Sequence, residues 1–392
     1  MSVLVVNAGS SSLKYRLVGD GDRAWASGQV ERIGGDADGE ALHRHGDHEA
    51  TTRLPVPDHA AAFRAMLDAF AAHGPDLDAA GVRAVGHRVV HGGTRFTAPV
   101  VVDDAVEEAI EDLAPLAPLH NPAGLRGIRV AREALGHLPQ VAVFDTAFHA
   151  TLPDAACTYA VPAEWRERHG VRRFGFHGIS HRDASRRARL MVGAPERFGV
   201  IVLHLGNGSS ACAVRDGISV ETSMGLTPLE GLVMGTRSGD VDPAVVEYLC
   251  RTAGMTVGDV HDALIHRSGL AGLAGTSDFR DVERAAAAGD PGAILALDVT
   301  AHRLVKYVGA YAAVLGRLDA VVFTGGIGFG SATLRRRVID PLGRMGLALD
   351  PAANRDAAGD RLVSASGSVP VLALRADEES EIARQVRELL DR

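Results

Sequence analysis

Short apolar runs alternate with polar turns over the first part of the chain. This alternation predicts consecutive strands joined by tight turns. The predicted strands and turns are, in order, 3–6, 7–12, 13–18, 19–22 and 24–33. The same pattern returns at 200–222, where a GNGSS turn at 206–210 replaces the NAGSSS turn of the first copy.

A repeat after about 200 residues indicates one fold present twice, and therefore two lobes around a cleft. Glycine permits close approach to the backbone, and serine adds hydroxyl donors. Each Gly-Ser-Ser turn can therefore bind an anion. We expect the two turns together to hold one polyphosphate.

The remaining chain alternates helical periodicity with short apolar runs, which predicts an α/β architecture. Residues 34–53 are rich in Gly, Asp and His without periodicity and predict a solvated loop. The predicted helices are 57–74, 103–114, 122–136, 242–253, 256–266, 279–288, 291–316 and 378–390. The predicted strands in this part are 84–90, 141–144 and 319–323.

With 392 residues the chain exceeds the usual size of a single core, so we expect two domains with a boundary near 146–153. No apolar run reaches membrane-spanning length, and residues 1–14 contain no export signal. The three cysteines, Cys157, Cys212 and Cys250, fit neither a disulfide framework nor a zinc ribbon. These features together predict a cytoplasmic protein.

The formal net charge of −8 argues against nucleic acid as a partner, because phosphate backbones attract basic surfaces. Of the 41 basic residues only Lys14 and Lys306 are lysines. Lys14 adjoins the first Gly/Ser turn, where a compact ammonium suits a phosphate. The alternative is that one lysine remained there by chance.

Two glycine-rich runs, 206–211 and 325–330, partly match known nucleotide-binding motifs. The run 206–211 fits G-x-G-x-x-A, but a strand and a hairpin turn are predicted after it, whereas the dinucleotide motif needs a helix. The run 325–330 follows a predicted strand and precedes a predicted helix from Ser331, which leaves a Rossmann dehydrogenase as an alternative. We prefer the interpretation that the glycines of the run 325–330 let the backbone approach a nucleotide closely. Neither run carries the Gly-Lys-[Ser/Thr] of a P-loop.

Two histidine pairs, His87 with His91 and His177 with His181, are spaced i, i+4 as for a metal on a helix. Both pairs lie among glycines and lack the Glu of a zinc protease. We expect most of the 17 histidines to be structural or solvated, and those beside Gly in loops are better functional candidates than the rest.

Arg88 and Arg237 each adjoin irregular, Gly-rich backbone. Ordering the loop 235–240 around Arg237 costs conformational entropy, and this cost favours a function for the loop. Guanidinium groups stabilise the charge of a transferring phosphoryl group. The alternative is that both are solvated surface arginines.

Taken together, these stretches resemble the acetate kinase family, within the sugar kinase, Hsp70 and actin superfold. The resemblance implies an α/β fold of two duplicated actin-like (ribonuclease H-like) lobes, usually as a homodimer. It implies an acyl/phosphate lobe at 1–149 plus 380–392 and a nucleotide-binding lobe at 150–379. The matching segments are 3–15, 86–93, 116–122, 144–149, 174–181, 204–210, 222–231, 234–242, 277–280, 323–328 and 377–379.

The resemblance further implies reversible phosphoryl transfer between ATP and acetate, giving acetyl phosphate and ADP by direct in-line displacement. Mg²⁺ would be required, with Mn²⁺ able to substitute, and neither nucleic acid nor membrane would be a partner. Two alternatives remain: a propionate kinase of the same family, and a non-catalytic nucleotide switch of the actin/Hsp70 superfold. The presence of Arg88, Arg237 and His177 favours an enzyme over the nucleotide switch, because a protein that only switches with a nucleotide needs no acyl pocket.

The resemblance also implies roles for single residues. Asn7 and Glu378 would organise the metal. The catalytic residues would be Asp145, Arg88, Arg237, His177 and His120, and the acyl site would be Arg88, Val90, Leu119, Phe176 and Pro228. The ATP-binding residues would be Ser10, Ser12, Lys14, His204, Leu205, Gly206, Asn207, Gly208, Asp278, Phe279, Arg280, Gly325, Gly326, Ile327 and Gly328.

Two positions bear on selectivity. The family usually continues its Gly-Gly-Ile-Gly run with Glu-Asn, whereas this chain has Phe329 and Gly330. Because these side chains offer no polar contact of that kind, we expect looser discrimination among nucleotides. Relatives that prefer propionate have a smaller residue at the position matching Val90, so Val90 favours acetate on steric grounds.

Overall fold

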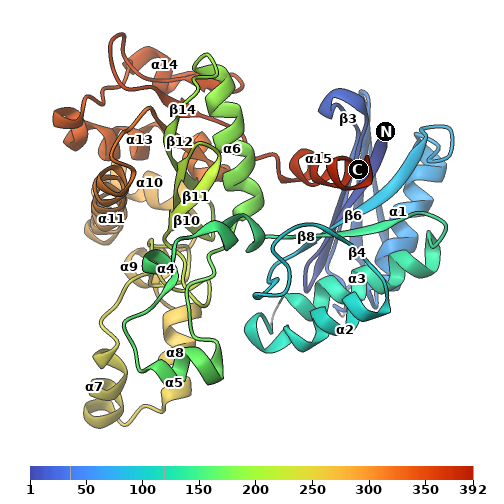
Figure 1. The fold of residues 1–392 in the computed structure, drawn as a ribbon, viewed down its shortest axis with the longest axis horizontal. Helices are drawn as coiled ribbons and strands as arrows, with labels where there is room; N and C mark the ends of the chain where they lie inside the picture. Colours follow the sequence, from blue (N-terminus) through green and yellow to red (C-terminus); the bar gives the residue numbers. More distant parts are fainter. Residues whose placement is uncertain (36, 119, 392) are drawn as a thin grey trace. The chain divides into compact units, whose positions relative to one another are not determined.

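The computed structural model describes residues 1–35, 37–118 and 120–391, which form two compact units. Unit 1 contains Met1–Ala150 and Asp377–Arg392, and unit 2 contains Thr151–Ala376. The chain therefore passes from one unit to the other twice. Each unit is built on a single sheet with helices on its faces (Figure 1).

Unit 1 is built on an eight-stranded sheet with the order β5-β4-β3-β2-β1-β6-β8-β7. The first five strands form an antiparallel meander, β1, β6 and β8 run parallel, and β7 pairs antiparallel with β8. The strands are β1 (Ser2–Ala8), β2 (Ser12–Val18), β3 (Ala24–Glu31), β4 (Gly39–His45), β5 (His48–Leu54), β6 (Val82–Val89), β7 (Val100–Val101) and β8 (Gln140–Phe144).

Helices cover both faces of this sheet. Leu4 and its neighbours on one face join a core with α1 and α3, and Val3 points to the opposite face because side chains alternate along a strand. On that face α15 lies close to β6, since a Cβ on Gly86 would come within 2.8 Å of Ile382 and 3.0 Å of Val386. The helices of unit 1 are α1 (His59–His73), α2 (Asp104–Asp112), α3 (Asn121–Ala134) and α15 (Glu378–Leu390).

The solvated loop predicted at 34–53 is wrong, because β4 and β5 form a hairpin there. The buried positions of β4 alternate as in a strand, but they are Gly39, Ala41 and His43, which carry no strong apolar signal. His43 is buried because its Nδ1 accepts from the Tyr15 hydroxyl (2.9 Å) and its Nε2 donates to a backbone carbonyl (2.7 Å). The edge strand β5 is polar, as edge strands often are.

Unit 2 is built on a six-stranded sheet with the order β11-β10-β9-β12-β14-β13. Its β11-β10-β9-β12-β14 segment repeats the order and the strand directions of β3-β2-β1-β6-β8 in unit 1. This confirms the predicted duplicated α/β fold. The strands are β9 (Gly199–Leu205), β10 (Ser209–Arg215), β11 (Ile218–Thr222), β12 (Ala320–Thr324), β13 (Arg361–Leu362) and β14 (Val371–Ala373).

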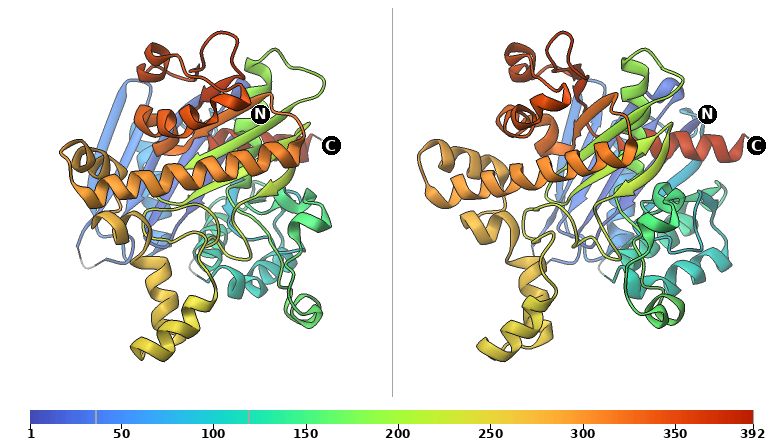
Figure 2. Two further views of the ribbon diagram at one scale, coloured as in Figure 1. Left: turned by 90° about the vertical axis from the view of Figure 1, so that its left-hand side faces the viewer. Right: turned by 60° about the vertical axis from the view of Figure 1, so that its left-hand side comes forward.

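Two long helices cover opposite faces of the unit 2 sheet. The helix α11 packs on β9 to β11, along the sheet in Figure 2, and α6 packs on β9 and β12. The helices are α4 (Asp154–Cys157), α5 (Ala163–His169), α6 (Gly178–Met191), α7 (Ala244–Ala253), α8 (Val257–His266), α9 (Gly269–Ala274), α10 (Phe279–Ala287), α11 (Pro291–Leu315), α12 (Gly325–Gly330), α13 (Ala332–Ile339) and α14 (Pro351–Arg355).

The two units exchange helices. After β8 of unit 1, the next long helix is α6, which packs on the sheet of unit 2. After β14 of unit 2, the chain returns to unit 1 as α15. Each sheet is therefore covered on one face by a helix that follows the other unit's parallel strands.

The helix predicted from Ser331 is confirmed as α13, since Ser331 is its N-cap and accepts from the Leu334 amide at 2.9 Å. The glycine run before it forms a separate short helix, α12, which the sequence did not predict. Glycine is a poor helix former, so tertiary contacts must hold this segment. The buried Arg335 donates to the carbonyls of Gly328 (2.8 Å) and Phe329 (2.6 Å) at its end. The antiparallel pairing of β10 with both β9 and β11 also excludes the Rossmann alternative, whose sheet is mostly parallel.

No helix within residues 1–35, 37–118 and 120–391 is both long enough and apolar enough to cross a membrane.

Candidate active site

Polar residues of unit 1 gather at the carboxyl ends of its parallel strands, on the face that α15 covers. Asn7 lies near the end of β1, Arg88 near the end of β6, and Asp145 directly after β8. Lys14 pairs with Asn7 across β1 and β2, so both side chains share this face. Open α/β sheets place their ligand sites at such strand ends.

Arg88 is the centre of this group. Its Nε and Nη2 donate to the Asp145 carboxylate at 3.1 and 2.7 Å, and its Nη1 lies 3.2 Å from a carboxylate oxygen of Glu378. Burial alone would lower the pKa of Arg88, but the charges of Asp145 and Glu378 outweigh it and raise that pKa. Burial raises the pKa of Asp145, whose side chain is only 2% exposed, and Arg88 opposes that rise.

Backbone contacts fix the loops that carry these residues. The Asp145 amide donates to the Val89 carbonyl at 2.9 Å, which ties the end of β8 to β6. The Asn121 side chain forms two 3.0 Å hydrogen bonds with the backbone of His91. The Gly92 amide donates to the Thr146 hydroxyl at 2.9 Å. Arg88 therefore projects from a rigid strand end.

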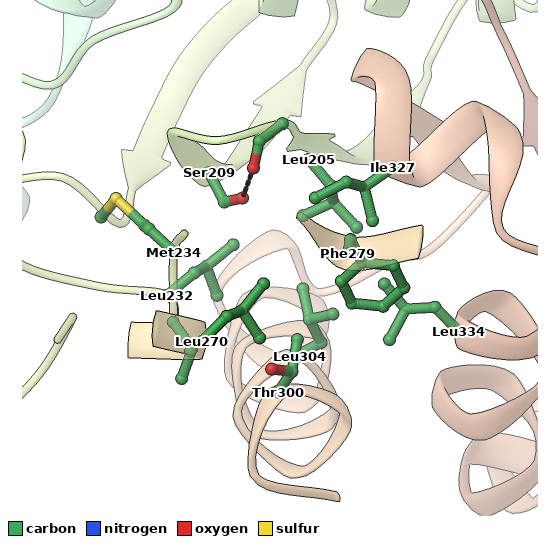
Figure 3. A pocket seen from close by; sticks show the side chains of 12 residues that line it. Leu205, Ser209, Leu232, Met234, Leu270, Phe279, Thr300, Leu304, Ile327 and Leu334 are labelled. Atoms are coloured by element: carbon green, nitrogen blue, oxygen red, sulfur yellow. Dashed lines mark hydrogen bonds between the residues drawn. The ribbon is translucent and has the colours of Figure 1, made fainter. Parts of the chain in front are cut away.

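The two Gly/Ser turns occupy equivalent corners of the two sheets. In unit 1 the Gly9 amide donates to the Ser12 carbonyl at 2.7 Å, with Ser10 and Lys14 exposed nearby. In unit 2 the turn is one residue shorter, because Leu205 pairs directly with Ser209. The Ser209 hydroxyl closes it by donating to the Gly206 carbonyl at 3.1 Å (Figure 3).

Three histidine rings of unit 2 cluster behind this second turn. The His177 and His204 ring centroids are 4.4 Å apart, and His181 lies 6.5 Å from the first and 6.3 Å from the second. His177 precedes α6 and His181 follows one turn later on the same helix. The i, i+4 spacing linked His177 with His181 but did not link either of them with His204. Sequence reasoning also missed Ser180 and Ser210, whose hydroxyls bond the rings.

Arg237 lies beside the same turn. A Cβ on Gly208 would stand 2.6 Å from Arg237 Nη2 and 3.5 Å from His177 Nε2, so a side chain at this position would displace the Arg237 guanidinium. Arg237 donates to the Pro228 carbonyl at 2.6 Å, and no Asp or Glu of the described residues forms an ion pair with it. Burial lowers the pKa of Arg237. The site therefore holds a partly desolvated positive charge with no acidic partner.

The loop that carries Arg237 is held at both ends. The Gly231 amide donates to Asp240 at 2.9 Å, and Asp240 in turn binds Arg303 at 2.8 Å and the Tyr307 hydroxyl at 3.0 Å. Gly231 has φ 109, a left-handed conformation that favours glycine. No local sequence pattern pointed to Arg303 and Tyr307, because they lie about sixty residues further along the chain.

An open pocket of about 620 Å³ lies beside the same turn in unit 2, within the size range of ligand sites. It brings together seven of the residues predicted to bind ATP: Gly206, Asn207, Asp278, Phe279, Arg280, Gly326 and Ile327. Leu205 instead lines a small apolar cavity with Phe279 and Ile327 (Figure 3). Gly325 and Gly328 are buried, and His204 belongs to the histidine cluster.

The rim of this pocket is polar. Arg280 binds Asp278 through two contacts at 3.0 and 2.6 Å, which lower the pKa of Asp278 to about 2. Glu283, which the sequence analysis missed, lines the pocket and accepts from the Ser331 hydroxyl at 2.6 Å. Gly330 also lines the pocket, whereas the Phe329 ring lies between Arg361 (5.0 Å) and Arg375 (5.3 Å).

The predicted acyl residues are distributed over both units. Val90 and His120 belong to unit 1, where Val90 is half-buried and His120 is exposed. Phe176 and Pro228 belong to unit 2, where Phe176 is buried and Pro228 is half-buried. Leu119 lies outside the described residues. The assignment of these residues to the acyl group stays a prediction.

The described residues contain no cluster of three His, Cys, Asp or Glu side chains that could hold a metal by itself. The oxygen donors of Asn7, Asp145 and Glu378 suit a hard cation such as Mg²⁺. Mg²⁺ typically takes only one or two carboxylates and completes its shell with water and substrate phosphates. The residues present therefore fit a Mg²⁺ that arrives with a nucleotide.

Comparisons with known proteins agree with this chemistry. A family model described as "Acetokinase family" matches residues 2–384. An acetate kinase of Leifsonia xyli subsp. xyli is 54% identical over 388 residues, which cover 98% of each chain. The crystal structure of Porphyromonas gingivalis acetate kinase matches with a TM-score of 0.93 at 38% identity over 99% of each chain. A propionate kinase from Francisella tularensis matches with a TM-score of 0.92 at 38% identity over 98% of each chain.

Proposed function

The chain belongs to the acetokinase family, and from this membership we propose that it transfers a phosphoryl group between ATP and acetate. The products are acetyl phosphate and ADP, and the reaction is reversible. The 98% coverage of the Leifsonia relative at 54% identity supports the same activity here.

One observation carries the proposal most directly: Arg237 is partly buried without an acidic partner in the described part of the chain. A desolvated charge destabilises the fold unless an opposite charge compensates it. A phosphoryl group bound beside Gly208 would supply that charge. The Gly206–Gly208 turn and His177 adjoin the same position.

The proposed step is a single in-line displacement. An acetate oxygen forms a bond to the γ-phosphorus while the bond from that phosphorus to the β,γ-bridging oxygen breaks, and ADP leaves with the electron pair. Acetate is already ionised at pH 7, so no general base is needed. Asp145 then positions Arg88, while Arg88, Arg237 and His177 stabilise charge on the phosphoryl oxygens.

We propose that Mg²⁺ is the metal, with Mn²⁺ as a substitute, and that Asn7 and Glu378 orient it. When bound, the ion neutralises phosphate charge and aligns the β- and γ-phosphates. Within unit 1 a Glu378 carboxylate oxygen lies 3.2 Å from Arg88 Nη1, so these two proposed site residues are neighbours. A shift of the Mg²⁺ dependence of ATP binding in Glu378→Gln would support this assignment without requiring turnover.

The decisive experiment is a hydroxamate assay for acetyl phosphate with acetate, ATP and Mg²⁺. We expect acetyl phosphate, and faster turnover with acetate than with propionate. Faster turnover with propionate would favour the propionate kinase alternative. ATP binding by a folded protein that forms no acyl phosphate would favour the nucleotide switch. With ATP chiral at the γ-phosphorus, a single displacement inverts configuration, and net retention would indicate a covalent phosphoenzyme.

Two further properties belong to the same proposal. We propose a homodimer, which sedimentation of the purified chain would test, and a cytoplasmic location, which fractionation of the source cells would test.

The first prediction concerns Val90, our candidate for contact with the acyl methyl. Val90→Ala should raise kcat/KM for propionate relative to acetate by roughly 10-fold, because one methylene in an apolar site is worth about 1–3 kcal/mol. The KM for ATP should stay nearly unchanged. Val100→Ala removes the same atoms from a half-buried valine of β7 and should leave the ratio as it was. If Val90→Ala keeps the wild-type ratio of kcat/KM for propionate to that for acetate, Val90 does not belong to the acyl site.

The second prediction concerns nucleotide choice. Gly330 lines the pocket and a Cβ there meets nothing within 4 Å, so Gly330→Asn should fold and add a polar contact. We expect the kcat/KM ratio of ATP to GTP to rise roughly 10-fold, equivalent to one hydrogen bond. Phe329→Glu is the matched comparison and should have a smaller effect, because the Phe329 ring lies between two arginines. Unchanged ratios for ATP, GTP and ITP in both variants would make this segment irrelevant to selectivity.

A further inference from the structure

The hydroxyl of Ser210 lies between two of the clustered histidines. Its Oγ is 2.8 Å from Nδ1 of His177 and 2.7 Å from Nε2 of His181. Both Ser210 and His181 are completely buried, so solvent does not compete for these bonds. Neither residue touches the proposed phosphoryl position directly, and the proposed function assigns them no role.

The chemistry of a hydroxyl limits the protons on these rings. A serine hydroxyl has one hydrogen and can donate to only one of the two nitrogens. At least one of His177 Nδ1 and His181 Nε2 must therefore carry a hydrogen. Which of them does so decides the tautomer of His177.

The opposite nitrogen of His177 faces the proposed phosphoryl site. Its Nε2 lies on the same side of Gly208 as Arg237 Nη2. Arg237 places a positive charge there, which disfavours a second charge on His177. A neutral His177 can donate to a phosphoryl oxygen only if Nε2 carries its hydrogen, and then Nδ1 must be an acceptor.

We propose that His181 and Ser210 form a directed hydrogen-bond relay that holds His177 in its Nε2–H form. In this relay His181 Nε2–H donates to the Ser210 oxygen, and the Ser210 hydroxyl donates to His177 Nδ1. The distances and the proton count require at least one ring nitrogen to donate to Ser210. The direction of the relay rests on the proposed function, because only His177 Nε2–H can donate to a phosphoryl oxygen. Ser210 and His181 are then positioning residues for phosphoryl transfer.

The backbone supports this arrangement. His177 has φ 57, an uncommon conformation for a non-glycine residue, and it begins α6 without a side-chain cap bond. Its ring bonds Ser210 of β10 and does not cap an amide of its own helix. His181 lies one turn later, with its amide 2.9 Å from the His177 carbonyl. The helix and the strand together fix all three partners.

The test reads the protons directly. In protein labelled with ¹⁵N-histidine, long-range ¹⁵N–¹H correlation spectra distinguish ring nitrogens that carry hydrogen from those that do not. We expect hydrogen on Nε2 of both His177 and His181, and none on His177 Nδ1. Hydrogen on His177 Nδ1 with a bare Nε2 would overturn the relay.

Substitution of Ser210 tests whether the relay supports phosphoryl transfer. Ser210→Ala should mix the tautomers of His177 and lower kcat about 10-fold, with the KM values for ATP and acetate within about 2-fold of wild type. Ser210→Thr retains the hydroxyl and should restore most of kcat. Thr222→Val is the control, since it removes a buried hydroxyl of β11 that bonds the Ala211 carbonyl at 3.2 Å and, among the described residues, bonds no histidine ring. It should change neither the spectrum nor kcat.

The outcomes separate the relay from the proposed function. A Ser210→Ala protein with an unchanged His177 spectrum and full kcat would overturn the relay while acetyl phosphate formation stood. The expected spectrum in a protein that forms no acetyl phosphate would support the relay's bond directions and refute the proposed function. Unfolding midpoints of the variants show whether a loss of rate reflects a loss of folded protein.

Discussion

Arg237→Lys should lower kcat by about 10²–10³-fold while the KM for ATP changes far less. A guanidinium can bind two phosphoryl oxygens at once, whereas an ammonium acts as a single point charge. Loss of one such group typically reduces kcat by that factor. The fixed position of Arg237, bonded to the Pro228 carbonyl on a loop held through Asp240, makes repositioning of a lysine difficult.

A matched control separates this effect from a general loss of arginine. Arg251→Lys changes an exposed arginine of α7 whose side chain is 66% exposed and which binds Glu247, four residues earlier. It should retain wild-type kinetics. Near wild-type kcat in Arg237→Lys as well would return Arg237 to the class of surface arginines.

Asp145→Asn should lower kcat about 10²-fold, and a higher pH should not restore the rate. The amide keeps the shape of the carboxylate but offers Arg88 one oxygen acceptor in place of two, so the guanidinium shifts. A displacement of about 1 Å at a reacting centre can reduce the rate by that factor. Because Asp145 is nearly fully buried, removing its charge should also lower the free energy of unfolding by about 3 kcal/mol.

The comparison variant is Asp112→Asn. Asp112 binds Arg95 at 2.9 Å on the surface of the same unit, with the two side chains 64% and 55% exposed. Its loss should lower the free energy of unfolding by less than about 1 kcal/mol and leave kcat unchanged. Recovery of the Asp145→Asn rate at high pH would instead indicate that Asp145 acts as a general base.

The duplicated fold was predictable because its signals are local. The meanders at the start of each sheet carry strong apolar alternation with Gly/Ser turns between the strands. The hairpin of β4 and β5 was not predictable, since its buried positions are Gly39, Ala41 and His43. Their burial depends on Tyr15 and on residues beyond α1, contacts that no short window of sequence contains.

The candidate site divides in the same way. Arg88 and Arg237 were singled out by their glycine-rich surroundings, and the fold places Arg88 against Asp145 and Arg237 beside Gly208. Their roles toward a phosphoryl group stay a prediction. The residues that hold the Arg237 loop and the glycine run of α12 were not predictable. Arg303 and Arg335 are two of many arginines in a chain that has only two lysines, so composition hides them. Their hydrogen bonds and ion pairs become visible only when distant segments are brought together.

The exchange of helices between the units sets an order for synthesis on the ribosome. The strands that carry Val3 and Gly86 are made early, but α15, which covers them, follows all of unit 2. Unit 2 is continuous and receives α6 before its first strand is made, so it can close its core while translation continues. The nascent amino-terminal sheet meanwhile presents one uncovered apolar face to chaperones and proteases. Glu378 arrives beside Arg88 only with α15, so a helix made after unit 2 both closes unit 1 and completes the acidic partners of Arg88.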